Sequence, residues 1–126
     1  MEIAQSIYEG LGWEVEDVSL SESFDLLCCR LGDELHVEVK GSTGPADQVT
    51  LTRNEVRHAQ SEAKTALVVV GLIDLSYTSS GIPSASGGVA RVLDPWLIDE
   101  ADLTPTQYQY SVPSSAQVVG DEVLPG

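Results

Sequence analysis

Two acidic residues and a lysine occur in a pattern that could bind a hard metal ion. They are Asp25, Glu38 and Lys40, and Val39 lies between the last two. Divalent cations such as Mg²⁺ and Mn²⁺ prefer oxygen ligands, commonly one or two carboxylates with waters. We therefore expect Asp25, Glu38 and the backbone carbonyl of Val39 to hold Mg²⁺ or Mn²⁺. Lys40 would then assist a water or stabilise charge that develops on a phosphate.

The same three charges also fit an ordinary exposed strand face. Carboxylates and ammonium groups on such faces commonly form weak surface ion pairs, and the spacing alone favours this interpretation. Two features favour a site instead. The loop that follows Lys40 begins Gly41-Ser42 and leaves open space beside it. The residues next to the three charges are strongly apolar, which predicts a central strand: Phe24, Leu26, Val37 and Val39.

A β-hairpin is predicted to bring the three charges together. Residues 24–31 and 34–41 have strand-like patterns, and the Gly-Asp pair at 32–33 is typical of a two-residue turn. This register pairs Asp25 with Lys40, and Glu38 follows one diagonal step away.

Side chains alternate along a strand, so each face of this hairpin has its own composition. One face would carry Asp25, Leu27, Cys29, His36, Glu38 and Lys40. The other would be an apolar core face of Phe24, Leu26, Cys28, Leu35, Val37 and Val39. His36 could thus reach the charged site, although a solvent-facing or hydrogen-bonded histidine is the simpler expectation.

The remaining patterns predict an α/β fold, with a mixed sheet of four to five strands flanked by helices. Thr52 and Glu55 form a capping box that begins the second helix. The expected elements are a helix at 2–11, a strand from 13, a helix at 53–64 and a buried strand at 66–73. After a mobile loop at 76–88 we expect a strand at 89–93, a short helix at 94–101 and an edge strand within 103–113.

Length and composition indicate one domain at residues 1–113, followed by an acidic tail or linker at 114–126. No apolar run approaches the roughly 20 residues that span a bilayer, so no membrane segment is expected. The adjacent Cys28 and Cys29 predict reduced thiols and a cytoplasmic protein.

The net charge of −14, from 6 basic and 20 acidic residues, opposes unaided binding to DNA. A protein partner or a second copy in a homodimer would have to supply basic contacts. Within the chain, Arg53, Arg57 and Thr43 could contact a phosphate backbone. The two arginines could equally pair with Glu55 and Glu62.

Four segments together resemble the C-terminal domain family named after the plant protein NO VEIN. They are residues 12–15, 24–26, 37–43 and 51–55, which read GWEV, FDL, VEVKGST and LTRNE. The resemblance continues through 67–71 and more faintly through 108–113, and so covers most of residues 1–113. It implies a restriction-endonuclease-like fold of the PD-(D/E)XK superfamily.

The resemblance also implies residue roles. It assigns Asp25 and Glu38 to the metal-binding acids and Lys40 to the catalytic lysine, while Phe24 stands where the superfamily motif has proline. Glu2 lies where many relatives place an extra acid, although an acid favoured by the helix dipole is the better expectation there.

The function implied is a metal-dependent nuclease, a hydrolase of DNA phosphodiesters, in a larger or oligomeric assembly of restriction or defence type. The alternative is a catalytically silent nuclease-fold module that binds a protein partner through its acidic surface. A mimic of nucleic acid that blocks a DNA-binding protein is a third hypothesis. Fold alone does not choose among them.

Overall fold

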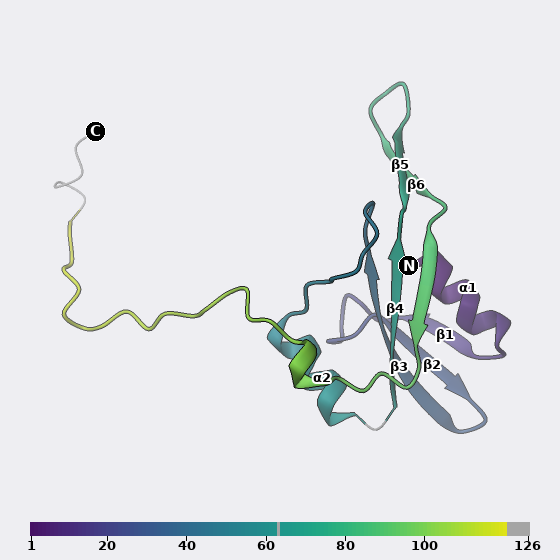
Figure 1. Cartoon of the computed structure of the whole chain (residues 1–126), viewed down its shortest axis with the longest axis horizontal. Coiled ribbons are helices and arrows are strands. Elements are labelled where there is room, and N and C mark those ends of the chain that lie inside the picture. The colour runs from purple at the N-terminus through teal and green to yellow at the C-terminus, as the bar shows by residue number, and fades with distance from the viewer. Residues whose placement is uncertain (63, 121–126) are drawn as a thin grey trace.

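The chain folds around one mixed sheet with a helix on each face, as seen in a computed structural model that describes residues 1–62 and 64–120 (Figure 1). The sheet has five strands in the order β1-β2-β3-β4-β7, so the expected α/β architecture is confirmed. The helices are α1 (Glu2–Gly10), α2 (Arg53–Ser61) and the short 3₁₀ helix η1 (Glu100–Asp102). The strands are β1 (Glu14–Asp17), β2 (Leu26–Arg30), β3 (Asp33–Gly41), β4 (Thr65–Gly71), β5 (Asp74–Tyr77), β6 (Pro83–Ser86) and β7 (Val89–Leu93).

Helix α1 covers one face of the sheet. Its apolar residues recur at the spacing of one helical side, and Ala4 and Tyr8 are completely buried. The sheet residues that form this core with α1 are Leu26, Cys28, Leu35, Val37, Ala66, Val68 and Val70. The core face expected from the hairpin is therefore present, and Cys28 is a buried free thiol within it.

Helix α2 lies on the other face, in the crossover between the parallel strands β3 and β4. Every residue of β4 is buried, so alternate side chains of this central strand fill both cores. Leu67 and Val69 pack with Ala59 of α2 and with Trp96. Helix α2 ends at Ser61, three residues before the expected end at Lys64. Gln60 is exposed, and Ala63 lies outside the described residues.

The β2–β3 hairpin has a different turn from the expected one. Arg30 pairs with Asp33, so the two turn residues are Leu31 and Gly32. Both have left-handed backbone angles, with φ of 51° and 83°, which is the requirement of a type I′ turn. The predicted pairing of Asp25 with Lys40 is therefore wrong by two residues. A shift of two residues leaves each strand side chain on its predicted face.

Two elements after β4 differ from expectation. The predicted mobile loop at 76–88 contains an exposed antiparallel ribbon of β5 and β6. The predicted helix at 94–101 does not form, because the backbone of Trp96 is bonded to the start of β4. The Trp96 amide donates to the Thr65 carbonyl at 2.8 Å, and the Trp96 carbonyl accepts from the Thr65 hydroxyl at 3.1 Å.

The expected edge strand within 103–113 is also absent. This segment runs away from the sheet in Figure 1, and Tyr108 and Tyr110 are 87% and 78% exposed. Pro105 and Pro113 lack amide donors for a strand ladder. Of the acidic tail expected at 114–126, residues 121–126 lie outside the described part of the chain. Across residues 1–62 and 64–120, no helix is both long and apolar enough to cross a membrane.

Candidate acidic metal centre

Glu38 is the buried acid at the middle of the candidate centre. It lies on β3 between Val37 and Val39, whose side chains face the core with α1. Alternation along the strand therefore turns the Glu38 side chain toward the α2 side of the sheet. Only 6% of its surface is exposed, so the fold places a carboxyl group in a nearly dry position.

Three carboxyl groups meet at this point. Burial, together with hydrogen bonds to the carboxyl groups of Glu55 and Asp25, raises the pKa of Glu38 to about 9. Glu38 therefore keeps its proton at neutral pH when no cation is present, because ionisation would place a third negative charge beside two others. The raised pKa of Glu38 means that the three carboxyl groups have too little positive charge near them for all three to ionise at neutral pH.

Lys40 lies beside the cluster and is bound mainly by Glu55. Its Nζ donates to both carboxylate oxygens of Glu55, at 3.0 and 2.9 Å, and lies 3.8 Å from Oε1 of Glu38. Burial alone would raise the pKa of Glu55. The hydrogen bonds from Glu38, from the Thr52 amide and from Lys40 outweigh burial and lower that pKa to about 2. Glu55 is therefore the ionised partner of both Lys40 and the protonated Glu38.

Asp25 and Val39 lie together on the β2 side of β3. Oδ2 of Asp25 accepts from the Val39 amide at 2.8 Å, although Asp25 itself lies just before β2 begins. The amide and the carbonyl of one residue point to the same side of an extended strand. The Val39 carbonyl therefore points toward the side where Asp25 lies, as a shared metal ligand set requires.

An open cleft of about 280 Å³ gives access to the acidic centre. Asp25, Glu38 and Glu55 all contribute to its walls, whereas Lys40 does not line it. The remaining lining residues are Ser19, Glu22, Ser23, Phe24, Thr52 and Asn54. Of the three charges singled out in the sequence, the two acids thus line an accessible cleft, and Lys40 lies behind them at 3.8 Å from Glu38.

The other residues singled out in the sequence lie outside the cleft walls. Arg53, Arg57 and Thr43 are exposed, and Glu2 is an exposed residue of α1, the helix on the opposite face of the sheet. Over the described ranges, the ion pairs of Glu55 and Glu62 are made to Lys40 and His36 and not to the two arginines.

Two features of this face were missed in the sequence. Glu55 was interpreted as a capping residue or as a partner of the two arginines, and its contact with Lys40 was not foreseen. The capping box is present, with the Thr52 amide donating to Glu55 Oε1 at 2.7 Å. Phe24 was expected on the same apolar face of the hairpin as Leu26 and Val37, but its ring lies on the other face, stacked on His36 at 3.9 Å and on His58 at 4.8 Å. Phe24 precedes β2, so the alternation of the strand does not determine where it points.

A comparison with protein families matches residues 1–72 to the model described as Protein NO VEIN, C-terminal. The matched segment is more than half of the 126-residue chain and contains Asp25, Glu38, Lys40 and Glu55. The fainter resemblance at 108–113 lies outside it. No curated protein and no solved structure matches the chain.

Proposed function

The chain belongs to the NO VEIN C-terminal family, and from this premise we propose that it is a metal-dependent nuclease domain that hydrolyses DNA phosphodiesters. One observation carries the proposal: the buried carboxyl group of Glu38 meets those of Asp25 and Glu55 in an open cleft beside Lys40. The superfamily placement as a restriction-endonuclease-like enzyme of the PD-(D/E)XK type is part of the same proposal.

The residues present fit a hard divalent cation. Carboxylate and carbonyl oxygens are the ligands that Mg²⁺ and Mn²⁺ prefer, and Asp25, Glu38 and the Val39 carbonyl would hold the ion. When bound, the ion would neutralise charge on phosphate oxygens and lower the pKa of a nearby water. The proton that Glu38 retains without metal supports this assignment, because a cation would replace that proton and remove the cause of the raised pKa.

The protein side chains would position the reacting groups. The amide of Val39 fixes the Asp25 carboxylate, and Glu55 fixes the ammonium of Lys40. Lys40 places an ammonium group at the centre, 3.8 Å from Oε1 of Glu38. We propose that it orients a water for attack on phosphorus or stabilises the charge that develops there.

A phosphate backbone would approach from the α2 side of the cleft. Thr52 and Asn54 line the cleft at the first turn of α2, where the helix dipole favours anions. Arg53 and Arg57 are exposed on the same helix and would add phosphate contacts. The net charge of −14 requires further basic contacts, which we assign to a second copy in a homodimer or to a protein partner.

The test is cleavage of supercoiled plasmid and of labelled single strands with Mg²⁺ or Mn²⁺. We expect the substitutions Asp25→Asn, Glu38→Gln and Lys40→Met each to lower the rate about a hundredfold or more. The matched controls are Glu16→Gln on the exposed edge of β1 and Lys64→Met, whose ammonium pairs with Asp33 at the surface. Cleavage that survives all three substitutions would remove the proposal.

A catalytically silent module is the second candidate function, and two observations favour it. The ammonium of Lys40 donates two hydrogen bonds to Glu55, and the chain as a whole is strongly acidic. In that case the acidic surface would bind a basic protein partner. Absence of cleavage with either metal, together with salt-sensitive binding of such a partner, would select this function.

A further inference from the structure

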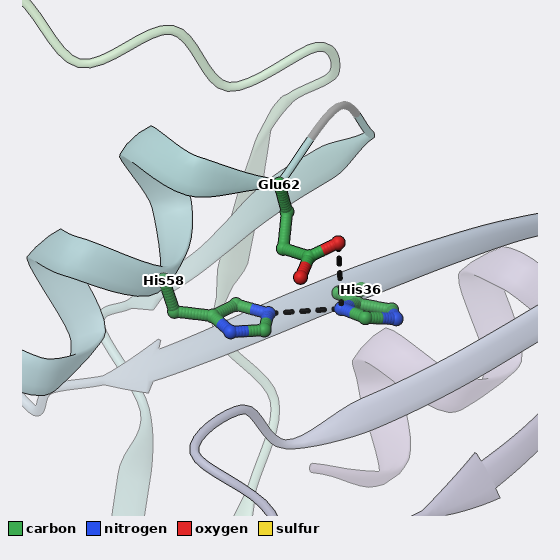
Figure 2. A group of neighbouring side chains, drawn as sticks. All are labelled: His36, His58 and Glu62. Atoms are coloured by element: carbon green, nitrogen blue, oxygen red, sulfur yellow. Dashed lines mark hydrogen bonds and ion pairs between the residues drawn. The ribbon is translucent and has the colours of Figure 1, made fainter.

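A second cluster of metal-ligating side chains lies on the α2 face of the sheet (Figure 2). It joins His36 of β3, His58 of α2 and Glu62, the C-cap residue that follows α2. Nδ1 of His36 lies 2.8 Å from Nε2 of His58 and 3.9 Å from Oε2 of Glu62. One ligand atom from each of the three residues lies within 4.8 Å of the other two.

The remaining ring nitrogen of each histidine has an oxygen partner of its own. Nδ1 of His58 lies 3.3 Å from the hydroxyl of Ser23, and Nε2 of His36 lies 3.1 Å from Oε2 of Glu34. Metal-binding histidines typically have this second contact, since it fixes the ring and the tautomer. Phe24 also stacks on both rings and holds them nearly coplanar.

The hydrogen bonds define a consistent set of protons for two neutral histidines. The Ser23 hydroxyl can donate to His58, the His58 Nε2–H to His36, and the His36 Nε2–H to Glu34. Burial and the neighbouring His36 lower the pKa of His58, which favours its neutral form. The His58 proton can also move from Nε2 to Nδ1, where the Ser23 hydroxyl accepts it. The lone pairs on Nε2 of His58 and Nδ1 of His36 then face each other, and no proton has left the site.

We propose that His36, His58 and Glu62 form a binding site for a transition-metal ion of the Zn²⁺ class, separate from the acidic centre. Two imidazole nitrogens and a carboxylate suit Zn²⁺, whereas Mg²⁺ prefers oxygen ligands only. Two nitrogens on one tetrahedral Zn²⁺ are about 3.3 Å apart, so the rings need to separate only slightly from their present spacing. Glu62 is partly exposed, which leaves a fourth position for water or a ligand.

This site would connect β3 to the end of α2, and it does not depend on nuclease activity. Its test is calorimetric titration of the untagged full chain with Zn²⁺. We expect one ion per chain, with affinity reduced more than about a hundredfold in His58→Gln and at least about tenfold in Glu62→Gln. The substitution Glu34→Gln should cost about tenfold to a hundredfold, because Glu34 only orients a ligand.

Two further variants make the result specific. Glu9→Gln, an exposed acid at the end of α1, is the matched control for Glu62→Gln and should bind Zn²⁺ as the native chain does. Glu38→Gln should also keep Zn²⁺ binding, since it alters only the acidic centre. Visible absorption of bound Co²⁺ reports tetrahedral ligation, and thermal unfolding in a chelator reports whether each variant folds. Three results would overturn the proposal. The native chain could fail to bind Zn²⁺, Glu62→Gln and His58→Gln could keep the native affinity, or Glu38→Gln could lose Zn²⁺ binding.

Discussion

Both carboxylate oxygens of Glu55 bind the ammonium of Lys40, at 3.0 and 2.9 Å, across the gap between α2 and β3. The same Glu55 side chain accepts from the Thr52 amide and completes the helix cap. One acid therefore both begins the helix and fixes the position of the lysine. Substitutions can therefore measure separately how much Glu55 contributes as a helix cap and how much it contributes by positioning Lys40.

The first prediction concerns Glu55→Gln. Glutamine can still accept from the Thr52 amide, so the cap survives, but the charge pair with Lys40 is lost. We expect the free energy of unfolding to fall by about 1–3 kcal/mol in urea denaturation, together with a loss of cleavage. The control Thr52→Ala removes the cap hydroxyl at a cost of about 1 kcal/mol. Thr52 lines the cleft but does not bind Lys40, so this variant should lower the cleavage rate far less than Glu55→Gln does. Equal loss of cleavage in both variants would contradict a positioning role for Glu55.

The second prediction is that stability of the metal-free chain falls as pH rises from 5 to 8. The pKa of Glu38 is about 9 in the folded state against 4.5 for the free side chain. The folded state thus holds a proton that the unfolded state releases in this window, so rising pH favours unfolding. The contribution of Glu38 is complete below pH 4.5 and is lost as pH rises through about 9.

Glu38→Gln supplies the comparison for this pH dependence. The amide copies the protonated acid, so we expect this variant to be about 1–3 kcal/mol more stable than the native chain at pH 8 in a chelator. Urea denaturation at several pH values measures the slope, with Glu16→Gln as control. A native slope that persists unchanged in Glu38→Gln would show that another group causes it.

The third prediction concerns protons released on metal binding. Mg²⁺ or Mn²⁺ at the acidic centre should displace the proton of Glu38, with close to one proton released per ion at pH 7. Calorimetry in buffers of different ionisation enthalpy measures this number. Zn²⁺ at His36 and His58 should release far less, because the hydrogen bonds permit an arrangement in which the His58 proton moves to Nδ1 and each ring presents a lone pair to the ion. Proton release that is the same for Mg²⁺ and Zn²⁺ would argue against two separate sites.

The fourth prediction is a stabilising substitution in the hairpin turn. Leu31 has a φ of 51° and is almost completely exposed, so it bears backbone strain without packing in return. Leu31→Asn creates an Asn-Gly type I′ turn and should raise the free energy of unfolding by about 0.5–1 kcal/mol. Cleavage and metal affinity should not change. Gly32→Ala is the converse control and should destabilise, since Gly32 has a φ of 83°.

Much of the centre was predictable because strand alternation is robust. Glu38 and Lys40 lie on the predicted side of β3 although the predicted register was wrong by two residues. Asp25 precedes β2, and its hydrogen bond from the Val39 amide holds it near them. The register was missed because leucine is an unusual residue at the first position of a type I′ turn. The Gly-Asp pair one position later looked like the stronger turn signal.

The contribution of Glu55 was not predictable from local sequence. Its capping role depends on Thr52 three residues earlier, whereas its contact with Lys40 depends on how the β3–α2–β4 crossover places the helix on the sheet. The face that Phe24 occupies and the backbone conformation around Trp96 were predicted wrongly for a related reason. Each lies beyond the end of a strand, where contacts distant in sequence decide its direction.

Alternation along β3 also limits how the length of this hairpin can change in evolution. One residue added or removed between the turn and Glu38 would rotate that carboxyl group toward Tyr8 and the aliphatic core, and would turn Val37 or Val39 into the cleft. Gains or losses of two residues would preserve the arrangement. Active relatives should therefore differ in hairpin length by even numbers of residues, and odd differences should mark members that have lost metal binding.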